Sequence, residues 1–390
     1  MNKVLTFFVA LIPILGIYKL GSIPLDIIFL TAGSIILIKK KTLFDYKLFF
    51  ILSSFLIIGI FSVINNYSAN EEYFFNNTYI GLLYFFLFSL IIKNADSRVF
   101  EKATLILGIF ASIIVIIQFI SYYLFNIPLE FKLPLNLIQA RDKYLSPIEW
   151  GRPDSLFLEP AHYSLFILPI MYNCLLRGKK IIIAFFFIAI VLSTSTTGFI
   201  VSLFLLFYHY IIKEKKILLT SVFFIIIYLL SIFFTDVFLR NIEKIDPTNI
   251  NSNVRVLGTK NLLEYILNDQ FFFGIGLNQI SSTYSGFDNY ANTFFMTFIS
   301  YGILGIIVLA ILVRYLFKIN NNRMYLFIFL FIMLSDQLLF NRNFFFLIST
   351  IYLFNNHKNQ NKNDRENNRR KLNQPISKTC VILDSHIDFR

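Results

Sequence analysis

The sequence predicts an all-α integral membrane protein that crosses the bilayer about twelve times. Of its 390 residues, 56% are hydrophobic and 15% are charged, whereas charged residues make up about a quarter of a soluble globular protein. Four uncharged runs are each long enough to cross about 30 Å of hydrocarbon as a helix. These runs are residues 73–92, 103–125, 217–235 and 291–313. Helices are expected because backbone groups inside a bilayer must be hydrogen-bonded within the segment.

The distribution of basic residues predicts the orientation of these helices. Clusters of Lys and Arg separate alternate apolar runs, and placing them on the cytoplasmic side satisfies the positive-inside rule. The clusters are Lys39–Lys41 with Lys47, Lys93 with Arg98 and Lys102, Arg177 with Lys179 and Lys180, Lys213 with Lys215 and Lys216, and Arg314 with Lys318 and Arg323. Both termini are then cytoplasmic, and the protein is expected in the cytoplasmic membrane. Because topology accounts for the net charge of +12, no nucleic acid is expected as a partner.

Helices can be assigned to three further stretches from their length and their flanking charges. The first helix is expected directly after Lys3, as an uncleaved anchor, because no A-x-A-like cleavage site follows it. Residues 181–212 would be about 48 Å long as one helix, which is too long for one crossing. Both flanks are basic, so this run is predicted to be a hairpin that turns at 193–198 on the outer face. The same reasoning makes 324–340 and 344–354 a final hairpin.

A single transmembrane domain is predicted over residues 1–354, followed by a polar, basic and disordered cytoplasmic tail over 355–390. Two long extracytoplasmic loops, at about 126–159 and 236–290, interrupt otherwise short connections. Unstructured loops longer than about 15 residues are usually functional or disordered. The two Cys and four His residues are scattered without ligand spacing. We therefore expect neither a disulfide framework nor a metal, and no cofactor.

The first long loop ends in the charged stretch GRPDSLFLEP. Pro160 suits the first turn of a helix, so a helix is expected to begin there with Glu159 at its N-terminus, where negative charge is favourable. Arg152 is the main candidate for anion binding, because a guanidinium binds phosphate oxygens bidentately and an ammonium does not. The alternative is an ion pair of Arg152 with Asp154 or Glu159 that stabilises the loop.

The second long loop offers Arg255 and Lys260 within RVLGTKNLLEYILN, which is predicted as a short helix at the outer membrane interface. Two outward arginine sites flanked by apolar helices would suit a ligand with a diphosphate head and a long hydrocarbon tail. The glycines of the following FFFGIG are interpreted as a turn, because a lone GxG is weak evidence for phosphate binding.

Further polar residues have both structural and functional interpretations. His162, one turn into the predicted helix, is either a hydrogen-bonded structural residue or a general base or donor to sugar. Ser193–Thr197 is either a polar helix break or a set of hydroxyls that lines a sugar site. Asp336 and Arg342 bracket the last outer turn, where an ion pair between them is expected, and Asp26 is expected to mark the membrane interface.

Between about residues 150 and 310 the chain resembles the O-antigen polymerase and ligase family. The resemblance lies in four stretches in a fixed order, namely GRPDSLFLEPAHYSLFI, LSTSTTGFIVSLFLLF, NVRVLGTKNLLEYILNDQFFFGIGLNQI and DNYANTFFMTFISYGILGI. It implies a polytopic glycosyltransferase on the outer face of the cytoplasmic membrane, which joins sugar units carried on undecaprenyl diphosphate without nucleotide sugars. The product would be O-antigen or capsule.

The resemblance also implies roles for single residues. Arg152 and Arg255 correspond to the family arginines that are expected to contact the lipid diphosphate, and Glu159 to the glutamate of a Glu-Pro motif. Family ligases carry a histidine before the asparagine that opens the helix ending in Gly-x-x-Gly. Here Ala291 precedes Asn292, which favours the polymerase branch over the ligase branch.

The general base stays open among Glu159, His162 and Asp288. Asp154, Lys260, Asp288 and Asn292 are expected to contact the substrate. The expected partners are an undecaprenyl-diphosphate-linked oligosaccharide, membrane lipid and, as a candidate, a chain-length regulator protein.

A lipid-linked oligosaccharide flippase or another transporter is the alternative from a different class, since it would be similarly polytopic. Such transporters tend to carry charges within the helix bundle and to consist of two related halves. In this sequence the basic residues lie in loops and no half-repeat is evident, so the enzyme is favoured.

Overall fold

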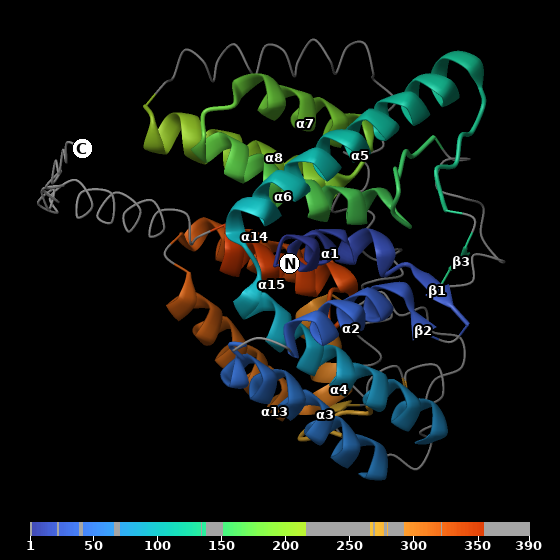
Figure 1. Ribbon diagram of the computed structural model, residues 1–390, viewed down its shortest axis with the longest axis vertical. Helices are drawn as coiled ribbons and strands as arrows, with labels where there is room; N and C mark the ends of the chain where they lie inside the picture. The colour runs from blue at the N-terminus through green and yellow to red at the C-terminus, as the bar shows by residue number, and fades with distance from the viewer. Residues whose placement is uncertain are drawn as a thin grey trace, which may run out of the picture. The chain divides into compact units, whose positions relative to one another are not determined.

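The computed structural model describes residues 2–21, 23–38, 42–65, 71–133, 135–137, 151–215, 266–267, 270–276, 279, 292–320 and 322–354. These residues are mostly helical (Figure 1). The helices are α1 (Asn2–Leu15), α2 (Leu25–Ile38), α3 (Tyr46–Asn65), α4 (Glu71–Asn94), α5 (Ser97–Phe125), α6 (Pro160–Leu176), α7 (Lys180–Leu192), α8 (Thr196–Phe207), α13 (Thr293–Ile319), α14 (Arg323–Ser335) and α15 (Arg342–Leu353). A π-helical turn, η2 (Tyr208–Lys213), continues α8.

Four of the described helical segments are long and apolar enough to cross a membrane, which agrees with the predicted all-α membrane class. They are Tyr46–Asn65, Ser97–Phe125, Thr196–Lys213 and Thr293–Ile319. Shorter apolar helices accompany them, among them α7 and α14. The predicted helix at 217–235 and the predicted tail at 355–390 lie outside the described residues.

A small antiparallel sheet, in the order β2-β1-β3, departs from the purely helical prediction. β1 (Tyr18–Leu20) and β2 (Ile23–Pro24) form the connection between α1 and α2, and β3 (Asn136–Leu137) belongs to the first long loop (Figure 1). Tyr18 pairs with Leu137 in this sheet, and the Tyr18 hydroxyl accepts a hydrogen bond from Leu133 N at 3.0 Å. The sheet therefore fastens the first long loop to the end of α1.

Both helix breaks that were argued from charge are present. α7 ends at Leu192 and α8 begins at Thr196, so the turn lies within the predicted stretch. Ser195 caps α8 by accepting a hydrogen bond from Gly198 N at 3.2 Å. The break between α14 and α15 falls between Ser335 and Arg342.

α1 and α5 run in the same direction, because contacts join the region of their starts and the region beyond their ends. Near the start of α1, Thr6 Oγ1 accepts a hydrogen bond from Asp96 N, the cap that precedes α5. Beyond the ends of both helices, Tyr18 contacts Leu133. The number of crossings and the side that faces the cytoplasm stay predictions.

α6 is the central helix, and every residue from Tyr163 to Leu175 is buried. It packs against α5, α7, α8, α14 and α15. A helix that is apolar on all sides must be surrounded by other helices. The charged stretch at 151–159 therefore leads directly into the core of the protein.

α13 is broken at Gly302, whose φ of 60° and ψ of −158° are not helical. The segment FFFGIG at 271–276 lies against this break and forms backbone hydrogen bonds with residues on both sides of it. Ile275 N and Gly276 N donate to the carbonyls of Ile299 and Ser300 at 2.9 and 3.0 Å, and Ile303 N and Leu304 N donate to those of Phe271 and Phe272 at 2.9 and 3.4 Å. The backbone groups released by the break are therefore hydrogen-bonded, as an apolar environment requires. The predicted turn is confirmed by positive φ values at Gly274 and Gly276.

Arg342 pairs with Asp26, and the predicted pair of Arg342 with Asp336 is wrong. Arg342 Nε lies 2.7 Å from Asp26 Oδ2, and its guanidinium lies 4.9 Å from the ring centroid of Tyr84. Asp336 instead accepts hydrogen bonds through its main-chain oxygen from Thr293 N and Oγ1. Asp26 therefore forms a buried ion pair with the first residue of α15. It also lies in the first turn of α2.

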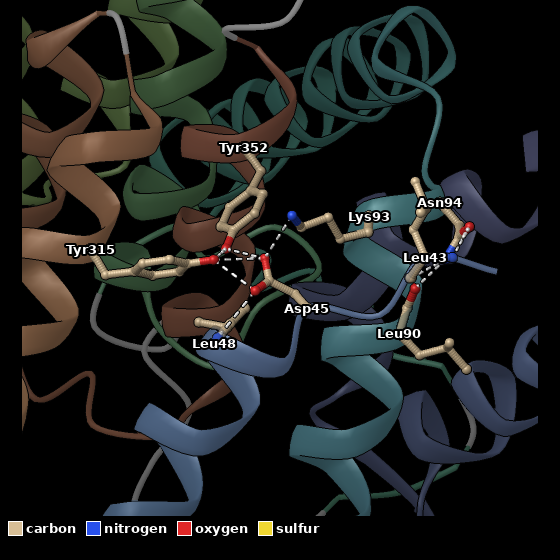
Figure 2. A network of polar contacts seen from close by, with 8 residues as sticks. All are labelled: Leu43, Asp45, Leu48, Leu90, Lys93, Asn94, Tyr315 and Tyr352. Atoms are coloured by element: carbon tan, nitrogen blue, oxygen red, sulfur yellow. Dashed lines mark hydrogen bonds and ion pairs between the residues drawn. The ribbon is translucent and has the colours of Figure 1, made fainter.

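A buried carboxylate, Asp45, joins four helices at the end where α3 begins (Figure 2). It caps α3 by accepting from Leu48 N at 3.2 Å. Tyr315 OH of α13 donates to its two oxygens at 2.7 and 2.8 Å, Tyr352 OH of α15 donates at 2.9 Å, and Lys93 Nζ of α4 lies 3.5 Å away. These donors compensate the cost of burying the charge.

We expect Tyr352→Phe to lower the free energy of unfolding by about 1.5–3 kcal/mol, because a hydrogen bond to a charged group is lost. Thermal unfolding of the purified chain in detergent measures this effect. Tyr46→Phe is the matched control, since Tyr46 is exposed beside the same network. Equal unfolding temperatures for the two variants would show that the Asp45 network adds no stability.

Candidate functional site

The charged stretch at 151–159 forms a turn that is fixed to α5. Gly151 and Ser155 have positive φ values of 68° and 58°. Gly151 is required there, because a Cβ atom would lie 2.6 Å from the Tyr122 ring. Ser155 N donates to Gln118 Oε1 at 2.8 Å, and Ser155 Oγ donates to Ala111 O at 2.8 Å. The turn is therefore held in one conformation.

Asp154 is buried in this turn and is held by Lys132, a residue of the first long loop. Lys132 Nζ lies 3.1 Å from Asp154 Oδ1, and the side chains are only 10% and 3% exposed. The same ammonium group donates to the carbonyls of Ser155 at 3.1 Å and of Phe157. Asp154 thus has a supporting role, and its contact with substrate stays a prediction.

Lys132 is not among the residues that the sequence predicts for the site. The one available signal was that the two long loops hold nearly all the basic residues that are predicted to face outward, against the positive-inside rule. No motif distinguishes this lysine from its neighbours, because its partner lies in a separate part of the loop.

Arg152 extends from this turn to the connection between α7 and α8. Its side chain is half-buried, and its Nε donates to Thr194 Oγ1 at 3.4 Å. Thr194 has a positive φ of 57° and is buried between Ser193 and Ser195, which are also buried. The guanidinium therefore lies against the hydroxyl-rich turn that was predicted from the sequence as either a helix break or a sugar site.

Glu159 and His162 lie at the start of α6. Glu159 is the N-cap residue with Pro160 directly after it, which confirms the predicted helix start. Its side chain is exposed and makes no capping hydrogen bond to the helix. His162 is half-buried in the first turn. The Glu159 carboxylate is therefore accessible at the mouth of the central helix.

The second part of the predicted site is described only at Asn292. This residue caps α13, and its side chain accepts a hydrogen bond from Phe295 N at 3.0 Å. Arg255, Lys260 and Asp288 lie outside the described residues. Among the residues that the structure describes, no three His, Cys, Asp or Glu side chains come together as a metal site.

The turn that contacts Arg152 and the break in α13 at Gly302 fall in one segment that matches a known family model. Residues 181–310 match the model of the O-antigen ligase family. No curated protein matches the chain. This match supports the O-antigen polymerase and ligase family at the level that both branches share, and it supports a membrane enzyme of the glycosyltransferase type that acts on lipid-linked sugars.

The O-antigen ligase match begins after α6, so Thr194 and Gly302 lie inside it and Arg152 precedes it. The contact of Arg152 with Thr194 therefore joins the first long loop to the matched segment. Chemically, this arrangement offers a cation held against hydroxyl groups, and an exposed carboxylate lies at the start of α6. Such a set suits an anionic leaving group, since a fixed cation stabilises charge that develops on it.

We expect Lys132→Met to destabilise the protein by about 3–5 kcal/mol, because the buried Asp154 carboxylate loses its cation. The double variant Lys132→Met with Asp154→Leu should recover part of this loss, since no buried charge remains. Thermal unfolding of both variants in detergent tests this. A double variant less stable than Lys132→Met alone would contradict the ion pair.

Proposed function

We propose that this chain is a polysaccharide repeat-unit polymerase of the cytoplasmic membrane. It would join oligosaccharides carried on undecaprenyl diphosphate at the outer face, supplying O-antigen or capsule. The observation that carries the proposal is the contact of Arg152 with Thr194, which brings the guanidinium that is proposed to bind phosphate against the segment similar to O-antigen ligases.

In the proposed reaction, a sugar hydroxyl of the acceptor unit attacks the anomeric carbon of the donor sugar. The bond from that carbon to the diphosphate oxygen breaks, and the lipid diphosphate leaves. Arg152, together with Arg255 from the second loop, would neutralise the charge on the leaving group. The proton of the attacking hydroxyl would pass to a general base.

Glu159 is the preferred base among the described candidates, because its carboxylate is exposed and is not used to cap α6. His162 and Asp288 remain alternative bases. Asp154, Lys260, Asp288 and Asn292 are proposed to orient the sugars, and a chain-length regulator is proposed as a protein partner.

An O-antigen ligase is the second candidate, and the description of the matched family favours it. A ligase would transfer a finished chain to another acceptor instead of extending it. Ala291 before Asn292, where family ligases carry histidine, favours the polymerase.

Deleting the gene and analysing the surface polysaccharide on a gel distinguishes these functions, because each predicts a different product. Loss of the polymerase leaves products of one repeat unit, and complementation with the full chain restores the ladder. Long chains that stay unattached would indicate a ligase instead. Lipid-linked units that remain on the cytoplasmic side would indicate a flippase.

A further inference from the structure

An apolar groove runs along the last turns of α5 and α7. Its volume is about 280 Å³, and its lining includes Ile116, Ile120 and Leu124 of α5 and Ile188 and Val191 of α7. The part of α5 between Ile116 and Leu124 extends for about 12 Å. The groove is apolar throughout.

One end of the groove meets the turn that carries Arg152. Tyr123 lines the groove, and its hydroxyl donates to the carbonyl of Gly151 at 3.3 Å, directly before Arg152. Leu192 also lines the groove, two residues before the Thr194 hydroxyl that Arg152 contacts. On both helices, therefore, the apolar surface leads to Arg152.

The groove is open on the side of the helices that faces away from the core. Ile120 is 42% exposed, Leu124 73% and Ile188 39%. In a helix that crosses a bilayer, exposed apolar side chains face lipid, and α5 is long and apolar enough to cross. A chain already in the bilayer could thus enter the groove sideways.

We propose that this groove holds the first isoprene units of the polyprenyl carrier while Arg152 holds its diphosphate. The inference rests on the proposed function and adds the place of the lipid tail. A cation at one end of a wholly apolar groove matches the junction between an anionic head and a hydrocarbon chain. The carrier reaches the site between α5 and α7 from the bilayer.

The groove orients the substrate and contributes little to its affinity. A hydrocarbon chain that moves from the bilayer into an apolar groove gains no hydrophobic free energy, because lipid is equally apolar. Packing in the groove instead fixes where the diphosphate lies relative to Arg152 and the attacking hydroxyl. A misplacement of about 1 Å at a reacting centre can cost a large factor in rate.

The test uses the full chain in nanodiscs with isotopically labelled undecaprenyl diphosphate. Benzoylphenylalanine replaces either Ile120, which lines the groove, or Ile113, which is 43% exposed on the same helix and is the matched control. After illumination, mass spectrometry identifies the cross-linked lipid. We expect the labelled carrier at position 120 and not at position 113, and we expect Arg152→Gln to remove it.

Cross-linking of phospholipid alone at position 120, or equal labelling at both positions, would overturn the proposal. A second variant, Ile120→Trp, fills the groove and should lower the polymerisation rate about tenfold or more, while Ile113→Trp should leave it unchanged. Equal rates for the two Trp variants would also overturn it. Specific labelling at position 120, together with a wild-type chain that forms no polymer, would support the groove and reject the proposed reaction.

Discussion

Arg152→Lys is expected to abolish polymer formation, with single lipid-linked repeat units persisting. The guanidinium can donate two parallel hydrogen bonds to phosphate oxygens while its Nε stays on Thr194. A lysine keeps the charge but has neither the fork nor the second anchor. Loss of one fixed donor to a developing charge typically costs about 10²–10³ in rate, or roughly 3–4 kcal/mol. Initial rates with purified chain and a gel of surface polysaccharide measure the effect.

Arg314→Lys is the matched control for this prediction. Arg314 is exposed on α13, in a basic cluster that the positive-inside rule predicts on the cytoplasmic side, so polymer length should not change. The amount of each variant in the membrane is measured alongside. Chains of normal length from Arg152→Lys would exclude the proposed role. Arg255→Lys is expected to have the same effect as Arg152→Lys.

Gly302→Ala is expected to destabilise the protein by several kcal/mol and to reduce the amount of folded chain. With φ of 60° and ψ of −158°, Gly302 has a backbone conformation that is essentially limited to glycine and costs other residues about 1–3 kcal/mol. A Cβ atom would also collide with the Phe272 carbonyl. The FFFGIG segment would be displaced, and the backbone groups that it satisfies would lose their partners.

Gly81→Ala is the control, because a Cβ atom there would meet Leu56 at an ordinary 3.7 Å in the helix α4. It should change the unfolding temperature by little. Thermal unfolding in detergent compares the two variants. If Gly302→Ala unfolds at the wild-type temperature, the break in α13 does not depend on glycine.

Local signals in the sequence were sufficient to predict several elements. Pro160 and the preceding glutamate mark the start of α6 because proline is favoured in the first turn of a helix, where a backbone N–H would have no partner within the helix. The turn at 193–195 followed from length and charge, since one helix of 181–212 would be too long for a bilayer. These features depend on a few neighbouring residues and on the thickness of the membrane.

Contacts between distant segments had no such signal. Asp26 with Arg342, and Lys132 with Asp154, depend on which helix ends and loops pack together. The break in α13 was also not predicted, because glycine is common in membrane helices and Gly302 gives no sign of a kink. Only the packing of the FFFGIG segment against α13 makes the break stable.

The central claim is that Arg152 recognises the diphosphate of a polyprenyl carrier. The most direct test compares the affinity of the purified full chain for undecaprenyl diphosphate and for undecaprenol, which lacks the phosphates. Wild-type chain should bind the diphosphate more tightly than the alcohol, and Arg152→Gln should lose most of this preference while Arg314→Gln keeps it. An Arg152→Gln variant that still distinguishes the two lipids as the wild type does would contradict the claim.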